Sequence, residues 1–275
     1  MAKIDHIRDL SDERISIFRS LKGKDLAGKG IFIAEGEKVV LKLLESECEI
    51  VSGLMTEAWF RKLRGTFGKR TAGDVPIFLM SRGRIEEIVG FKLHQGLMIA
   101  AKEPRRPTLR EASKSWRSPH LILALNALKD SENVGMIVRN AAAFGVDALI
   151  VDRQTVHPYL RRPVRVSMGA VMDVPVISVD RLPDALRWLT RNCGTRIIVT
   201  SPHAKARGID TVSFKGNICL VLGSEGRGVS RAVTSAADLV VAIPMSGPVD
   251  SLNVASASAI LLYQCSKGRL KAGSK

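Results

Sequence analysis

The sequence predicts an α/β protein whose carboxyl-terminal part is a parallel sheet covered by helices, preceded by a smaller α/β unit. At 275 residues, the chain is longer than one average domain. From Leu121 onward, short runs that are apolar throughout alternate with segments of helical periodicity, which is typical of parallel strands buried on both faces. A similar alternation of shorter runs ends near Lys102, so we expect a separate unit over residues 1–101.

The first unit contains one clear strand-turn-helix pattern. "GIFIAEG" is typical of a strand that ends in a turn, and "EKVVLKLLES" places two pairs of apolar residues on one helical face. Three further apolar runs predict strands. The expected elements are a strand at 30–36, a helix at 37–46, and strands at 49–55, 75–80 and 95–101.

Residues 102–119 predict a basic linker, because they combine three prolines and many cations without apolar periodicity. The segment is either a solvated tether or a strip that follows a phosphate backbone, and its composition does not decide between the two. A basic tail is expected at 267–275.

Residues 120–266 are expected to form the larger domain. Buried strands are predicted at 121–125, 147–151, 174–178, 196–201, 218–223 and 239–244. Helices are predicted at 132–144, at 182–192 and from about 255, with a basic loop at 153–170.

The charge balance predicts a polyanionic partner. Lys and Arg number 42 against 27 acidic residues, a formal net charge of +15, and such a field attracts nucleic acid. A basic protein without any nucleic-acid role is the alternative. The aromatic content of 5% argues against a surface that binds mainly by stacking bases.

Cysteine usage and hydropathy narrow the class further. Cys48, Cys193, Cys219 and Cys265 are scattered without a CxxC pair, so we expect buried thiols and neither a disulfide framework nor a metal site. The apolar runs are shorter than a membrane span, and no secretory signal opens the chain. We therefore expect a cytoplasmic protein.

Three segments carry candidate chemistry, and the first is "DSENVGMIVRNAAAFG". Asp130 or Ser131 is expected to cap a helix whose apolar stripe leaves Arg139 outside the core. A solvated Arg139, and a purely local cap role for Asn133, are the alternatives.

The second and third segments are "VLGSEGRGVS" and "IPMSGPVDSLNVASASAI". Glycines after the buried strand at 218–223 allow backbone amides to approach a ligand closely, although taken alone they are more often explained by a tight turn. The third segment is a bent loop followed by a helix whose first turns lack bulk. It is either a close-approach surface or a tightly packed core helix, and in the second case Asn253 needs a hydrogen-bond partner.

These segments, in this order, resemble the three signature motifs of the SpoU branch of the SPOUT-class RNA methyltransferases. "RVSMGAVMDVPV" is similar to a further element of that family, and "FIAEGEKVVLKLLES" and "HQGLMIAA" resemble its small, ribosomal-protein-like substrate-binding domain. The resemblance implies methylation of a ribose 2′-hydroxyl in rRNA or tRNA with S-adenosylmethionine, with rRNA favoured. It also implies a deep trefoil knot and a homodimer formed through the carboxyl-terminal domain.

The resemblance also implies roles for individual residues. The positions expected to hold the cofactor are Gly223, Ile243, Leu252, Leu222, Met245 and Thr200. The expected catalytic set is Arg139, Asn133, Glu225, Ser251 and Asn253. From their charge, we expect the RNA-holding residues to be Arg105, Arg106, Arg161, Arg162 and Arg165.

Two other classes compete with this interpretation. An open dinucleotide-binding fold would place its glycine-rich turn after the first strand, whereas here the glycines come late. A non-enzymatic RNA-binding protein would retain the fold without needing the polar set.

Overall fold

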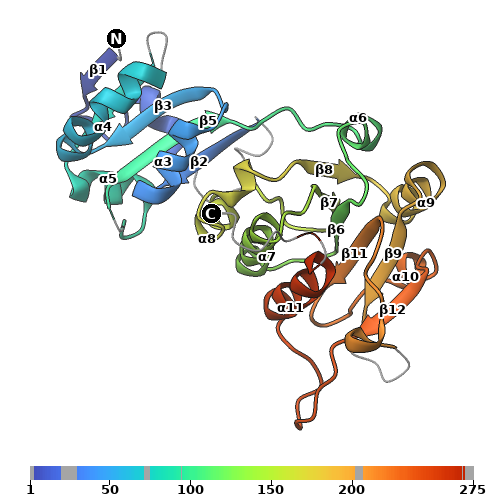
Figure 1. The fold of residues 1–275 in the computed structure, drawn as a ribbon. Coiled ribbons are helices and arrows are strands. Elements are labelled where there is room, and N and C mark those ends of the chain that lie inside the picture. Colours follow the sequence, from blue (N-terminus) through green and yellow to red (C-terminus); the bar gives the residue numbers. More distant parts are fainter. Residues whose placement is uncertain are drawn as a thin grey trace. The chain divides into compact units, whose positions relative to one another are not determined.

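The structure is a computed structural model that describes residues 3–19, 30–70, 75–93, 95–201, 207–267 and 269, with the backbone alone at 69 and 70. The chain divides into two compact units, each built on its own sheet (Figure 1). The first unit is Met1–Arg105 together with Tyr159–Met172, and the second is Arg106–Pro158 together with Asp173–Lys275.

The first unit has a five-stranded mixed sheet in the order β1-β4-β3-β5-β2. β1, β4 and β3 run parallel, and β5 pairs antiparallel with both β3 and β2. Its strands are β1 (Lys3–His6), β2 (Ile31–Glu35), β3 (Ile50–Met55), β4 (Pro76–Leu79) and β5 (Leu97–Lys102). Its helices are η1 (Glu13–Ile15), α1 (Ser16–Arg19), α3 (Glu37–Glu45), α4 (Glu57–Arg70), α5 (Arg82–Val89), α8 (Arg161–Val166) and η2 (Ala170–Met172).

The second unit has a seven-stranded sheet in the order β10-β12-β9-β11-β6-β7-β8, and every pairing is parallel. Its strands are β6 (Leu121–Asn126), β7 (Ala148–Asp152), β8 (Val176–Val179), β9 (Arg196–Thr200), β10 (Arg207–Gly208), β11 (Ile218–Gly223) and β12 (Leu239–Ala242). Its helices are α6 (Leu109–Ser113), α7 (Ser131–Ala143), α9 (Leu182–Cys193), η3 (Ile209–Thr211), α10 (Arg231–Thr234) and α11 (Val254–Ser266).

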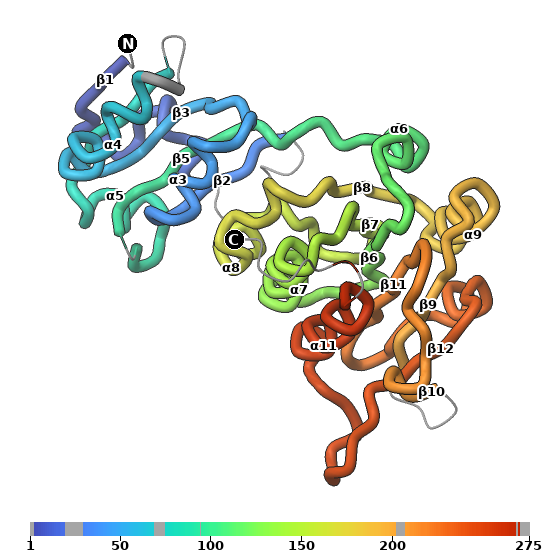
Figure 2. Tube along the Cα trace, in the orientation of Figure 1, coloured from blue at the N-terminus to red at the C-terminus, as the bar shows by residue number. Residues whose placement is uncertain are grey.

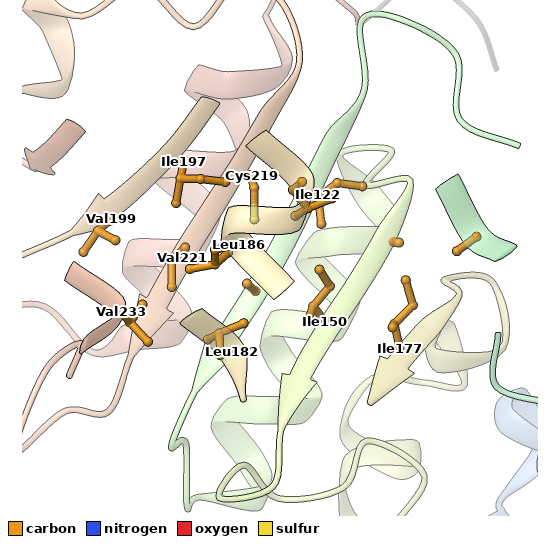
Figure 3. Packing of buried hydrophobic residues seen from close by; sticks show 14 residues of the cluster. Ile122, Ile150, Ile177, Leu182, Leu186, Ile197, Val199, Cys219, Val221 and Val233 are labelled. Atoms are coloured by element: carbon orange, nitrogen blue, oxygen red, sulfur yellow. The ribbon is translucent and has the colours of Figure 1, made fainter. Parts of the chain in front are cut away.

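Helices cover both faces of this sheet. On one face, Leu182 and Leu186 of α9 belong to one apolar cluster with Ile122, Ile150 and Val221 of the central strands, and Leu186 lies next to Val221 (Figure 3). On the other face, α7 and α11 pack side by side, as the chain trace shows (Figure 2). Burial of the strands on both faces explains why β11 is apolar and why β6 is apolar up to its last residue, Asn126.

The predicted parallel α/β class is confirmed, and all six strands predicted for the larger domain form, with bounds that shift by a few residues. The strands at β1 and β10 and the helices α4 and α5 were not predicted. Two expectations are wrong in detail: the linker contains the capped helix α6, and the basic loop at 153–170 contains α8 and η2.

The predicted division into 1–101 and 120–266 also differs from the structure. Tyr159–Met172 clusters with the first unit, because α8 packs on β2. The ring of Tyr159 meets Phe32 edge-on, with the centroids 5.2 Å apart. Most of the predicted tail at 267–275 lies outside the described residues.

Cysteines, metal-binding side chains and membrane spans can each be checked over the described part of the chain. The four cysteines are free thiols, and three are buried whereas Cys193 is half-buried. Burial raises the pKa of the Cys265 thiol to about 12, so it stays protonated. Among the described residues, no cluster of His, Cys, Asp and Glu is suited to a metal ion, and no helix has the length and hydropathy of a membrane span.

Candidate active site

Helix α7 presents Asn133 in its first turn because Asp130 caps the helix. The Asp130 carboxylate accepts hydrogen bonds from the backbone N–H groups of Glu132 and Asn133, both at 2.8 Å. Asn133 is buried, and its side chain is directed toward the segment that follows β11. Capping therefore fixes the position of Asn133, a polar residue that is not part of the apolar stripe of the helix.

Side chains from three distant segments meet at this helix end. Asn133 donates from Nδ2 to Oε1 of Glu225. Asn253 donates from Nδ2 to Oδ1 of Asn133 at 3.0 Å and to Oε1 of Glu225 at 3.3 Å. An ionised carboxylate only accepts hydrogen bonds, so Glu225 sets the orientation of both amides. We refer to Glu225, Asn133 and Asn253 as the polar triad.

Asn253 also begins helix α11. Its Oδ1 accepts hydrogen bonds from the backbone N–H groups of Ala255 at 2.8 Å and Ser256 at 3.3 Å. The side chain uses its oxygen for the cap and its nitrogen for the triad, so the start of α11 and the position of Glu225 depend on the same residue.

The segment Gly223–Ser230, which we call the anchored loop, folds back on itself. Ser224 and Gly228 form an isolated bridge, with the Gly228 N–H donating to the Ser224 carbonyl at 2.7 Å. A Cβ atom at Gly223 would lie 2.2 Å from the Gly228 carbonyl carbon and 2.3 Å from the Val229 nitrogen. Only glycine fits between two stretches of backbone this close.

A cavity of about 560 Å³ lies between the anchored loop and the segment Ile243–Leu252, which we call the exposed loop. The exposed loop links β12 to α11 and projects from the second unit (Figure 1). From Pro244 to Leu252 every residue is exposed, including Val249 with 58% of its surface accessible. The size is that of a site for a small molecule.

All six residues expected to hold the cofactor line this cavity: Gly223, Ile243, Leu252, Leu222, Met245 and Thr200. Of the expected catalytic set, Glu225 and Ser251 line it as well, and the triad connects Asn133 and Asn253 to Glu225. The structure therefore brings together residues that are more than a hundred positions apart in the sequence.

Arg139 is placed differently from the rest of the expected set. It is exposed on α7 and is not among the residues that line the cavity. Three large apolar side chains are also exposed on α7 and its neighbour α11: Met136 at 45%, Ile260 at 40% and Tyr263 at 50%. Arg139 thus lies one helical turn from Met136 rather than beside the triad.

Sequence reasoning missed two guanidinium groups at the cavity. Arg227 of the anchored loop and Arg231 of α10 line the cavity and are exposed. Arg227 stands inside the glycine-rich segment, so its position in that motif was the available signal. Arg231 follows the motif without a distinguishing pattern.

The residues expected to hold RNA lie in different surroundings. Arg105, Arg106, Arg162 and Arg165 are exposed, and Arg106 donates to Oγ of Ser178 at 3.2 Å. Arg161 donates from Nε to the buried Glu35 carboxylate at 2.8 Å.

The half-buried Arg161 is in contact with an aromatic ring as well as with Glu35. Its guanidinium lies 3.8 Å from the ring centroid of Phe91. Burial lowers the pKa of Arg161, and the charge of Glu35 opposes that shift. The charge of Arg161 is thus paired inside the first unit, and its contact with RNA stays a prediction.

Comparison with known proteins decides the family. The profile of the SpoU rRNA Methylase family matches residues 120–263, more than half of the chain. The chain belongs to this family. The match begins one residue before β6 and ends within α11, so it spans the anchored loop, the exposed loop and the whole polar triad.

Individual SpoU relatives extend the likeness to both units. A tRNA/rRNA methyltransferase of Mycobacterium bovis, itself uncharacterised, is 32% identical over 95% of this chain and 91% of its own length. The 23S rRNA (guanosine-2′-O-)-methyltransferase RlmB of Coxiella burnetii is 33% identical over 76% of this chain and 84% of its own. The first match spans nearly the whole chain and so includes the amino-terminal unit, and the second is longer than the family domain alone.

The solved structures agree on the fold. An AdoMet-bound rRNA methyltransferase of Sinorhizobium meliloti superposes with a TM-score of 0.84, covering 98% of this chain and 99% of that one, at 24% identity. Membership of the SpoU family excludes the alternative of an open dinucleotide-binding protein.

Proposed function

We propose that this protein is an S-adenosylmethionine-dependent methyltransferase that modifies the 2′-hydroxyl of one ribose in ribosomal RNA, and that it acts in the cytoplasm as a homodimer. The observation that carries the proposal is the cavity in which all six expected cofactor residues meet beside the polar triad. The names of the relatives favour rRNA over tRNA, and the net charge of +15 suits a polyanionic substrate.

The cavity suits S-adenosylmethionine in both size and chemistry. Leu222, Met245 and Leu252 offer apolar surface to an adenosine moiety, and the glycine at 223 lets backbone groups approach it. Glu225 and Arg227 place both signs of charge on the wall, which suits the ammonium and carboxylate of a methionyl group. When bound, the cofactor supplies an activated methyl group on sulfur.

The residues of the chain orient the ribose 2′-hydroxyl and stabilise the negative charge that develops on its oxygen. Methyl transfer from sulfur to a ribose oxygen is a displacement reaction, and alignment of the reacting atoms provides much of its acceleration. The triad holds Glu225 at the cavity wall, and Ser251 lies on the wall as well. We assign to these groups the hydrogen bonds that orient the ribose.

We assign to Arg139 an electrostatic role. A guanidinium keeps its proton at neutral pH and is therefore a poor base. It is well suited to fix a phosphate and to stabilise negative charge that develops on the 2′-oxygen. The proton leaves through that phosphate or through water.

The homodimer explains how Arg139 reaches an active site. Its side chain is exposed on α7, as is that of Met136, and Ile260 and Tyr263 are exposed on α11, which packs against α7. Apolar side chains exposed on neighbouring helices are typical of a surface that another subunit covers. We propose that a second copy covers this face and that Arg139 acts in the cavity of the partner subunit.

The fold detail implied by the family resemblance is a deep trefoil knot, which we propose for the segment from β11 to α11. Its support is family membership together with the path of the chain: after β12, on the far side of β9, α11 returns to pack against α7 and β11. Knots are otherwise nearly absent from protein folds.

The test uses the full-length protein and labelled S-adenosylmethionine. We expect calorimetry to show binding of the cofactor, and incubation with ribosomal RNA to yield one 2′-O-methylated nucleotide that nuclease mapping identifies. Transfer RNA serves as the competing substrate. Methylation of a base, or labelling of tRNA alone, contradicts the proposal, and binding of RNA without cofactor affinity supports the non-enzymatic alternative.

The role of Arg139 is tested separately. We expect Arg139→Ala to reduce turnover by about 100-fold while the cofactor affinity stays within about twofold, because the interaction that it removes belongs to the transition state. Near-normal turnover on the RNA contradicts a catalytic role. Arg191→Ala, an exposed arginine on α9 that does not line the cavity, is the matched control.

The RNA-holding surface is tested by salt dependence. We expect the replacement of Arg162 and Arg165 by Ala to lower the slope of log K against log[salt] by about 0.7–0.9 for each phosphate that is no longer neutralised. Arg161→Ala is expected to destabilise the first unit instead, because it leaves the buried Glu35 carboxylate with only the longer ion pair to Arg165, at 3.8 Å. An unchanged slope in the Arg162 and Arg165 variants excludes that surface.

A further inference from the structure

Asn126, the last residue of β6, connects the core of the second unit to the anchored loop. It is 5% exposed, and in the ladder between β6 and β11 it pairs with Gly223, where the anchored loop begins. Its Oδ1 accepts a hydrogen bond from the backbone N–H of Ser230 at 2.8 Å. One side chain therefore lies beside the start of the anchored loop and bonds to its end.

Asp152 fixes the orientation of that amide. Nδ2 of Asn126 donates to Oδ2 of Asp152 at 2.7 Å, and both residues are buried. The carboxylate accepts and cannot donate, so the amide nitrogen of Asn126 faces Asp152 and the amide oxygen faces Ser230. The direction of the hydrogen bond to the anchored loop is thus set by a charge at the end of β7.

Asp152 is itself held by the turn that follows it. Its Oδ1 accepts from the Thr155 backbone N–H and from the Thr155 hydroxyl, both at 2.8 Å, and from the Gln154 N–H at 3.1 Å. The carboxylate also accepts from the N–H of Ala127, which has a left-handed φ of 58°. Backbone in that region is unfavourable for alanine, so this network also maintains a strained turn beside Asn126.

We infer that Asn126 is a positioning residue, oriented by Asp152, that holds the anchored loop in place and so sets Glu225 at the cavity wall. Neither Asn126 nor Asp152 lines the cavity, so the effect passes through the loop and not through contact with a ligand. The loop carries Glu225 and Arg227 between Gly223 and Ser230, and both of its ends are tied to β6. The positioning of the loop does not depend on the proposed function, whereas the effect on catalysis rests on it.

The test is a reciprocal exchange of the two side chains in the full-length protein. Asn126→Asp removes the donor and places two carboxyl groups together, and we expect a loss of at least about tenfold in kcat/KM. The Asn126→Asp/Asp152→Asn double variant restores one donor and one carboxylate in reversed order. We expect it to regain activity to within about threefold of the starting protein, as a double-mutant cycle of coupled residues should.

Hydrogen exchange provides a readout that does not depend on enzymatic activity. Asn126→Ala should speed amide exchange over residues 224–230 by about tenfold and leave residues 243–252 unchanged, because of these two segments only the anchored loop loses a hydrogen bond. Asn217→Asp is the matched control, since the Asn217 side chain bonds to Ser118 and Cys193, outside the loop. It should alter stability without changing exchange at 224–230.

The outcomes separate the inference from the proposed function. If the unaltered protein does not methylate RNA, the proposed function fails, and the exchange experiment still decides whether Asn126 holds the loop. Unchanged exchange in Asn126→Ala overturns the inference. So does a double variant that is no more active than Asn126→Asp, even when both fold with similar melting temperatures.

Discussion

The two loops that border the cavity are built on opposite principles. The anchored loop is held by the bond from Ser230 to Asn126, by its own Ser224–Gly228 bridge and by the contacts of Glu225 with two amides. The exposed loop has accessible apolar side chains, and none of its side chains hydrogen-bonds to another described residue. One wall is organised within a single chain, whereas the other is suited to being completed by a ligand or a second copy.

The largest effect on activity is expected from disrupting the polar triad at the anchored loop. Glu225→Gln keeps the shape but removes the charge and replaces one carboxylate oxygen with an N–H donor. We expect turnover to fall by about 100-fold, the scale of losing a preorganised electrostatic contact. Single-turnover methylation measures this, with thermal unfolding as the check on folding. A change in turnover below about threefold shows that the charge of Glu225 does not contribute to catalysis.

A smaller effect is expected from crowding the start of the same loop. A methyl group at Gly223 meets backbone of Gly228 and Val229, which cannot rotate away. We expect Gly223→Ala to weaken cofactor binding by about tenfold and to lower the free energy of unfolding by about 1–3 kcal/mol.

Gly226→Ala is the matched control for this change, because nothing lies within 4 Å of a Cβ there. It should change the free energy of unfolding by less than about 0.5 kcal/mol. Equal effects of the two substitutions would contradict the tight backbone approach at Gly223.

The smallest effect is expected from a substitution in the exposed loop. If a second copy covers this side, Val249→Asp should weaken the dimer by about fivefold, the scale of one apolar contact outside the centre of an interface. Its melting temperature at high concentration should change little, because Val249 is 58% exposed. Sedimentation over a dilution series measures the dimer, with Ile4→Asp, which is exposed in the first unit, as the control.

Much of the second unit could be predicted because its strands are apolar throughout and its helices are amphipathic. The α7 stripe and the start of α11 follow from periodicity and small residues. The cofactor residues could be named because their motifs resemble a family whose site is built from the same segments. Residues joined by the triad are far apart in the chain, so no local pattern indicated which of them would touch.

Other parts depend on tertiary contacts that sequence patterns do not record. Arg161 was assigned to RNA because it stands in a cationic run, yet the buried Glu35 that pairs with it lies 126 positions away. Helix α8 forms where a loop was expected, and it packs on β2 of the first unit. Asn126 carried no signal either, since an asparagine at a strand end is also an ordinary turn residue.

The placement of Tyr159–Met172 in the first unit has a consequence for modularity. A gene fusion or truncation that exchanged only the stretch up to Arg105 would leave α8 behind, with Tyr159 and Arg161 stripped of Phe32, Phe91 and Glu35. The amino-terminal unit therefore depends on two separate stretches of sequence, and the second of them lies inside the segment that matches the SpoU family.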